Sequence, residues 1–112
     1  MSTDAVTQFD IDPDVTDGEI ASRAADYMIA EYAHKTEGFG ARYMPGGRRP
    51  KNPEGWQIDP PFDTPEVRAW MVGVLLAGHS ISVYGNRTRP TLNLGTLAVI
   101  RRRARERRKG RR

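Results

Sequence analysis

The sequence predicts a small α+β domain that is mainly helical, with two to three helices, a long Gly/Pro-rich loop and a short β-hairpin. Its 112 residues suffice for one domain, and 38% hydrophobic against 29% charged residues allow one modest core. Two stretches have helical spacing behind N-capping residues, and a third alternates like a strand. We therefore expect an acidic N-terminal arm over 1–15, a single globular domain over 16–100 and a basic C-terminal tail over 101–112.

The first predicted helix begins at Thr16. Thr16 and Glu19 have the spacing of a capping box, in which the hydroxyl and the carboxylate each accept a backbone N–H. Apolar residues then recur every three or four positions, with alanines on the face that a neighbouring helix would approach. The helix is expected to run to about residue 34 or 35. It should end at Gly38 and Gly40, because glycine tolerates the positive φ of a helix C-terminus.

Residues 37–62 contain too many glycines and prolines for a regular element, so a long irregular loop is expected there. Loops of this length are commonly functional or ordered by a partner. This one is either a flap over the domain's own core or a partner-binding loop. Its basic cluster 48–51 lies between Tyr43 and Trp56. These aromatic side chains could pack the loop onto the domain or stack on nucleic-acid bases, and packing is the favoured interpretation.

The second predicted helix spans Pro65 to about Ala77. Thr64 supplies an N-cap hydroxyl, and Pro65 suits the first helical position. Glu66 favours the positive end of the helix dipole. Apolar residues occur on both sides of this helix, so we expect it to be surrounded by other elements and to form the centre of the core.

A strand pair and a third helix complete the expected fold. Residues 80–84 alternate as in a strand, and 91–94 return after a turn that carries Arg87 and Arg89. An irregular link between two helices is the alternative. From Thr96 the composition again favours a helix. The apolar positions that would anchor it are Leu94, Leu97, Ile100 and Ala104.

Charge is divided sharply along the chain. Residues 1–66 carry 13 acidic and 6 basic side chains, whereas residues 67–112 carry 1 acidic and 12 basic ones, giving −7 and +11 of the net +4. The arm holds four aspartates around Phe9 and Ile11, which form a candidate docking pair. The last 12 residues hold 8 arginines. Such a tail repels itself, so it should fray alone and become ordered when anions neutralise it.

The basic tail is the strongest functional signal. Clustered guanidinium groups gain affinity for a nucleic-acid backbone by releasing counterions and by bidentate contacts to phosphate. We therefore expect a non-enzymatic nucleic-acid-contacting protein that uses this Arg-rich segment for sequence-independent binding to DNA or RNA phosphates. The expected contacts are Arg101, Arg102, Arg103, Arg105, Arg107, Arg108 and Lys109, extended by Arg87 and Arg89. An acidic protein surface, including the acidic first half of this chain, is the main competing partner, since the far half of the tail lacks the bulky apolar residues that suit an anionic membrane.

The alternative function is a structural subunit of a large assembly, such as a virion or a ribonucleoprotein particle. The arm, the long loop and the tail would then extend from a small body of regular structure to neighbouring protein subunits. A free binding protein and an assembly subunit differ in size at physiological salt, because only the subunit forms a ring or a larger complex.

Other functional classes find little support in the sequence. Without cysteine there is no disulfide, thiolate metal site or cysteine nucleophile, and His34 and His79 lack carboxylates at ligand spacing. The alternating aspartates of the arm lack the glycine and the glutamate of a calcium loop. The longest apolar stretch, 69–78, is too short for a bilayer, and the acidic N-terminal residues do not resemble a secretory signal. We expect no enzyme, no metal, no cofactor and no membrane contact, in a cytoplasmic or virion-associated protein.

Overall fold

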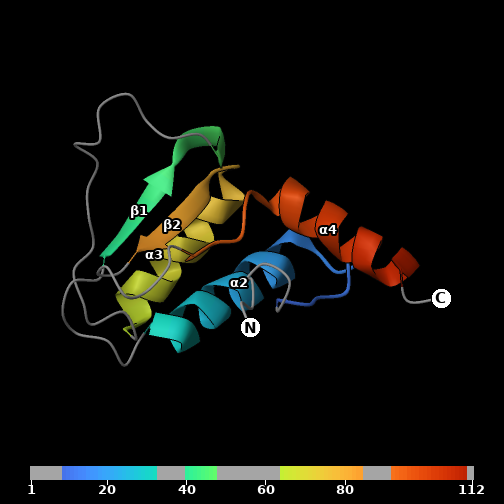
Figure 1. Cartoon of the computed structure of the whole chain (residues 1–112). Helices are drawn as coiled ribbons and strands as arrows, with labels where there is room; N and C mark the ends of the chain where they lie inside the picture. Colours follow the sequence, from blue (N-terminus) through green and yellow to red (C-terminus); the bar gives the residue numbers. More distant parts are fainter. Residues whose placement is uncertain (1–8, 33–39, 48–63, 85–91, 111–112) are drawn as a thin grey trace.

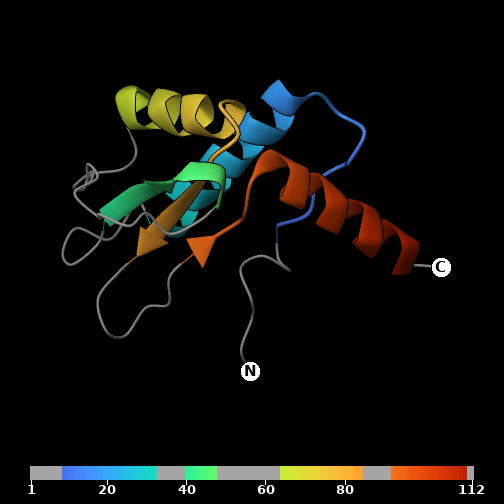
Figure 2. The ribbon, with the colours of Figure 1, turned by 90° about the horizontal axis from the view of Figure 1, so that it is seen from above.

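The computed structural model describes residues 9–32, 40–47, 64–84 and 92–110 (Figure 1). Within these residues it contains three α-helices and a small three-stranded antiparallel sheet, which confirms the predicted small, mainly helical α+β fold. In chain order the elements are α2 (Asp17–Tyr32), β1 (Gly40–Met44), a short 3-10 helix (Pro45–Gly47), α3 (Pro65–Leu76), β2 (Ser80–Tyr84), β3 (Leu92–Asn93) and α4 (Leu97–Gly110). Helices α2 and α3 lie on one side of the sheet, and α4 extends away from it (Figures 1 and 2).

Both predicted helix starts are confirmed by their capping hydrogen bonds. The Thr16 hydroxyl accepts the backbone N–H of Glu19 at 3.2 Å, immediately before α2. The Thr64 hydroxyl accepts the backbone N–H of Val67 at 3.2 Å, and Pro65 is the first residue of α3. Helix α2 is described as far as Tyr32. Its predicted end at Gly38 lies outside the described residues.

The predicted strand pair is also confirmed. Strands β2 and β3 are antiparallel, with Ser82 opposite Asn93 and Val83 opposite Leu92. The Asn93 amide donates to the buried hydroxyl of Ser80 at 3.3 Å, which satisfies a polar group inside the core. The connecting turn, with Arg87 and Arg89, lies outside the described residues.

The sheet contains a strand that the sequence analysis did not predict. Strand β1 lies within the stretch assigned to an irregular loop, and Gly40, expected to help end the first helix, is its first residue. It pairs antiparallel with β2, with Ala41 opposite Val83 and Tyr43 opposite Ile81. Gly47, at φ 82°, follows the strand in a conformation that suits glycine. Residues 48–63, with the basic cluster and Trp56, lie outside the described part of the chain.

One core joins the helices to the sheet. The α2 face that meets α3 is made of alanines and two larger residues, all fully buried: Ile20, Ala21, Ala24, Ala25 and Met28. Small side chains let the two helices approach closely, as their spacing in the sequence predicted. From the sheet, Ile81 and Val83 enter the same cluster at 1% and 0% exposure.

Helix α3 buries one side only, which differs from the expectation that it is surrounded. Val67, Met71 and Leu75 point into the core, whereas Val72 and Val74 are half-buried and Leu76 is 50% exposed. Val72 and Val74 still pack against the edge of the core, so α3 is partly covered on its flanks and open at Leu76. The prediction that α3 is surrounded was wrong because it treated apolar residues such as Val72 and Leu76 as buried.

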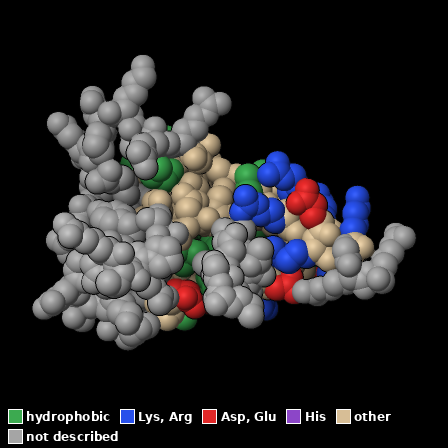
Figure 3. All heavy atoms as spheres, in the orientation of Figure 1, with side chains coloured by type: hydrophobic (Ala, Val, Ile, Leu, Met, Phe, Trp, Pro, Cys, Tyr) green, Lys and Arg blue, Asp and Glu red, His purple; other side chains and the backbone are tan. Residues whose placement is uncertain are grey.

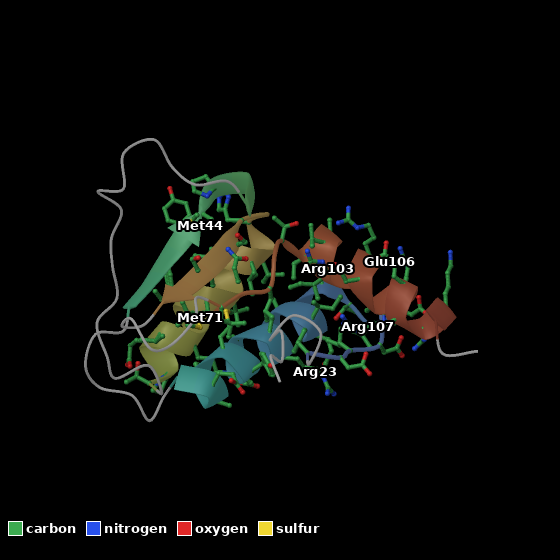
Figure 4. All side chains as sticks on the ribbon, in the orientation of Figure 1. Arg23, Met44, Met71, Arg103, Glu106 and Arg107 are labelled. Atoms are coloured by element: carbon green, nitrogen blue, oxygen red, sulfur yellow. The ribbon has the colours of Figure 1, made fainter. Side chains whose placement is uncertain are left out.

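Met71 provides a test of this core. It is fully buried between α3 and its neighbours (Figure 4), so Met71→Ala should lower the free energy of unfolding by about 2 to 5 kcal/mol through lost burial and a cavity. The matched variant Leu76→Ala, at an exposed position of the same helix, should change it by no more than about 0.5 kcal/mol. Urea denaturation followed by circular dichroism measures both, and equal losses would contradict the assigned packing.

Candidate nucleic-acid interface

Helix α4 carries the arginines and is attached to the core along one side. Its first turn is capped by Thr96, whose hydroxyl accepts the backbone N–H of Val99 at 3.4 Å. Leu97, Ile100 and Ala104 are buried, as their spacing predicted. The helix continues to Gly110, whereas the sequence analysis expected residues beyond Arg101 to need external anions for order.

Residues 9–15, the described part of the acidic arm, pack against the body of the protein. Phe9 and Ile11 were expected to be a docking pair for a partner, but both belong to the chain's own core, at 7% and 9% exposure. The Phe9 ring contacts that of Tyr27 on α2, with 5.2 Å between ring centroids. Asp10 and Asp12 alternate with these apolar residues and are exposed. The arm runs beside α4 (Figure 1), and its exposed carboxylates are within reach of the α4 arginines.

Arg101 joins α4 to the end of the arm. The Nη1 of its guanidinium donates to the backbone carbonyl of Val15 at 2.8 Å and also to the backbone carbonyl of Pro13. Its Nη2 forms an ion pair with Asp17, the first residue of α2. The Arg101 side chain is only 22% exposed. It therefore satisfies backbone acceptors that the irregular arm cannot pair with itself.

Arg107 makes a second connection of the same kind, two turns further along α4. Its Nη2 donates to the backbone carbonyl of Phe9 at 2.6 Å, and its Nε lies 3.6 Å from Asp10 Oδ1. The side chain is 20% exposed and points from α4 towards the arm (Figure 4). Arg101 and Arg107 thus hold the two ends of the described arm by charge-assisted hydrogen bonds to its backbone.

Arg108 contacts the arm differently, through carboxylates alone. Its Nη2 lies 3.1 Å from Asp12 Oδ1 and its Nη1 lies 3.4 Å from Asp14 Oδ2, and the side chain is 57% exposed. Asp12 also accepts the backbone N–H of Asp14 at 2.9 Å. That hydrogen bond, followed by the charge of Arg108, lowers the pKa of Asp12 below the usual range of a carboxyl group.

The other four cations of α4 form a surface that we name the outer basic face: Arg102, Arg103, Arg105 and Lys109. No carboxylate among the described residues lies within ion-pair distance of them. Arg102, Arg105 and Lys109 are exposed, and their i, i+3, i+7 spacing aligns them along one stripe. Arg103 is half-buried at the margin. Figure 3 shows Lys and Arg side chains gathered over α4. Arg103 lies one turn before Arg107, and both border a small hollow that is also lined by Phe9, so Arg103 marks the inner edge of this face.

The residues predicted to contact nucleic acid thus fall into two groups in the structure. Arg101, Arg107 and Arg108 face the arm, whereas the outer basic face is open. Arg87 and Arg89 lie outside the described residues. The acidic first half of the chain was a competing partner of the tail in the sequence analysis, and the structure pairs three of the seven α4 cations with aspartates from it. Which of its residues do so was not predicted, although the alternation of apolar and acidic residues from Phe9 to Asp14 was the signal that could have revealed it.

The described part of the chain contains neither a cluster of metal-binding side chains nor a membrane-spanning helix. No group of three or more His, Asp or Glu side chains is placed there to hold an ion. His79 accepts the backbone N–H of Gly46 at its Nδ1, at 3.1 Å, and its ring meets that of Tyr43 edge-on, with 5.4 Å between centroids. None of the described helices is long and apolar enough to span a bilayer.

Comparisons with protein-family models, with curated protein sequences and with solved structures find no match to this chain. The evidence for a function therefore comes from the side chains of the described residues and their positions.

The two arginines Arg107 and Arg108 are neighbours with different roles, and stability measurements should separate them. Arg107→Ala leaves the Phe9 carbonyl without its charged donor, so it should cost about 1.5 to 3 kcal/mol of unfolding free energy. Arg108→Ala removes only two exposed ion pairs and should have a much smaller effect. Urea denaturation of both variants is the measurement. A larger loss for Arg108→Ala would show that the arm is held by its carboxylates.

The lowered pKa of Asp12 predicts a defined dependence on pH. A carboxyl group with a depressed pKa in the folded state stabilises the fold above its unfolded value near 4, and this contribution is lost as pH falls through the folded value. Asp12→Asn should therefore be less stable than wild type at about pH 6, and the difference should be smaller at about pH 2.5. Denaturation midpoints at both pH values test this. A difference that is independent of pH would contradict it.

Proposed function

We propose that this protein binds the phosphate backbone of nucleic acid, without sequence preference, through the outer basic face of α4. The observation that carries the proposal is a row of exposed cations with no carboxylate partner among the described residues, on a helix whose other cations are matched with the aspartates of the arm. The proposed role is binding and not catalysis.

The geometry of the stripe suits a phosphate strand. From Arg102 to Lys109 the helix rises by about 10 Å, at about 1.5 Å per residue. Phosphates of one strand of B-DNA follow one another every 3.4 Å or so along the axis, so three long side chains can reach several of them. Each contact releases condensed counterions, which makes the affinity fall steeply with salt.

The composition of the face favours backbone contact over base recognition. Its members are long cationic side chains, and asparagine and glutamine, which read adenine edges, are absent from α4. Glu106 is the one acid on this helix and lies on the same side as Arg103 (Figure 4). The net charge of the outer side remains positive, which is the requirement for counterion release.

The alternative function, a structural subunit of a virion or ribonucleoprotein particle, finds less support. It required an arm that extends to neighbouring subunits, whereas residues 9–15 pack on their own chain. Size-exclusion chromatography at physiological salt distinguishes the two roles. A monomer or dimer is expected for the proposed function, and a ring or larger particle for the alternative.

Removing two cations of the stripe tests the proposal. Arg102→Gln/Arg105→Gln should lower the affinity for a DNA duplex about a hundredfold at 50 mM salt and reduce the slope of log K against log salt by about 1.8, because two phosphate contacts are lost. Fluorescence anisotropy with labelled duplexes of unrelated sequence, and with RNA, measures this. The wild type should bind all duplexes alike.

The matched control is Arg42→Gln/Arg68→Gln, which makes the same charge change on β1 and α3. Both elements lie away from the outer basic face (Figure 1), and Arg68 pairs with Asp26, so this variant should keep the wild-type salt slope. Equal losses in both variants would mean that net charge alone governs binding. Tight binding to polyglutamate with no binding to DNA would point to an acidic protein partner and overturn the proposal.

A further inference from the structure

We infer that Arg108 is a latent phosphate-binding residue, which Asp12 and Asp14 hold away from the outer basic face in the free protein. The inference rests on the proposed function and adds a regulator to the same site: the arm acts as an internal competitor of the polyanion. It is carried by the different ways in which three arginines of α4 contact the arm.

Arg108 lies beside the stripe without belonging to it. Arg105 and Arg108 are three positions apart on α4, a spacing that places their side chains next to each other on the helix surface. A guanidinium at position 108 therefore has the reach to join a strand bound at Arg105 and Lys109. In the structure it is directed to the arm instead, at 3.1 Å from Asp12 and 3.4 Å from Asp14.

The contacts of Arg108 are of the kind that a phosphate can replace. They are two ion pairs to exposed carboxylates, and the side chain itself is 57% exposed. Exposed pairs of this kind are weak, so little is lost when they open. A backbone phosphodiester offers the same guanidinium two oxygen acceptors with the single charge of a carboxylate, and it belongs to a row of like charges whose counterions are released on binding.

The contacts of Arg101 and Arg107 with the arm, unlike those of Arg108, are not easily replaced by phosphate. Each donates to backbone carbonyls of the arm and is about one-fifth exposed. Opening those bonds would leave carbonyls without donors beside a buried Phe9. These two arginines therefore keep the arm in place while Arg108 exchanges partners, so no unfolding of the arm is required.

Asp12 and Asp14 are suited to releasing Arg108 without losing their local structure. The Asp12 carboxylate also accepts the backbone N–H of Asp14, and an asparagine side chain makes the same turn through a neutral, weaker acceptor. Asp12→Asn/Asp14→Asn therefore removes the negative charge around Arg108 while keeping the backbone conformation. This allows the competitor to be removed on an intact fold.

The test is a double-mutant cycle measured by anisotropy with a labelled DNA duplex at several salt concentrations. Asp12→Asn/Asp14→Asn should bind about tenfold tighter than wild type at 50 mM salt, with a salt slope steeper by about 0.9, because one phosphate contact is added. Arg108→Gln should change binding little in the wild type. In the Asp12→Asn/Asp14→Asn background it should abolish the gain.

The charge-matched control is Glu31→Gln/Glu66→Gln, at the end of α2 and the start of α3, away from α4 (Figure 1). It should give a smaller gain that does not depend on Arg108. If the wild type binds DNA but the gain of Asp12→Asn/Asp14→Asn survives Arg108→Gln or equals that of the control, the inference fails and the proposed function stands. If neither wild type nor Asp12→Asn/Asp14→Asn binds, both fail.

Discussion

Repulsion between cations destabilises a helix in which seven of fourteen residues are cationic, and nearby anions offset it. Cations three and four positions apart on a helix face repel each other, and α4 contains several such pairs. The protein meets this constraint within its own chain. Asp10, Asp12, Asp14 and Asp17 come to one side of α4, where three of its arginines find carboxylate partners. The apolar residues between these aspartates bury into the core and fix the carboxylates in position.

The pairing of three α4 arginines with the arm decides which cations of α4 stay exposed. Because the arm covers one side of α4, the cations on the other side are left exposed on a helix that is already anchored through Leu97, Ile100 and Ala104. A binding surface built in this way is ordered before the partner arrives, so less conformational entropy is lost on binding than for a disordered tail. The arm therefore has two roles. It stabilises α4, and it limits how many arginines are available to a polyanion.

The parts of the fold that were predictable are those whose determinants are local in sequence. The caps at Thr16 and Thr64 depend on residues three positions away, and the helices that follow them begin as predicted. The β2 and β3 pair was likewise indicated by local alternation. Strand β1 was missed because its pairing with β2 is a long-range contact, which the glycines around it concealed.

The candidate site was predictable only in composition. Arginine clustering indicated a phosphate-binding surface and a need for neutralising anions, but it gave no way to tell which arginines face inward. That distinction depends on contacts between Phe9 and Arg107, which are 98 positions apart, and between Pro13 and Arg101, which are 88 apart. Such pairings are set by how the arm packs on the core, and no local pattern at residues 101–110 specifies them.

The central claim is that α4 has an inner side committed to the arm and an outer side available to a polyanion. Side-chain nitrogen NMR tests it most directly, by following the Nε–Hε signals of the α4 arginines during titration with a short DNA duplex. The account predicts that Arg102 and Arg105 shift strongly while Arg101 and Arg107 stay unchanged. Uniform shifts of all four signals, or strong shifts at Arg101 and Arg107 alone, would contradict it.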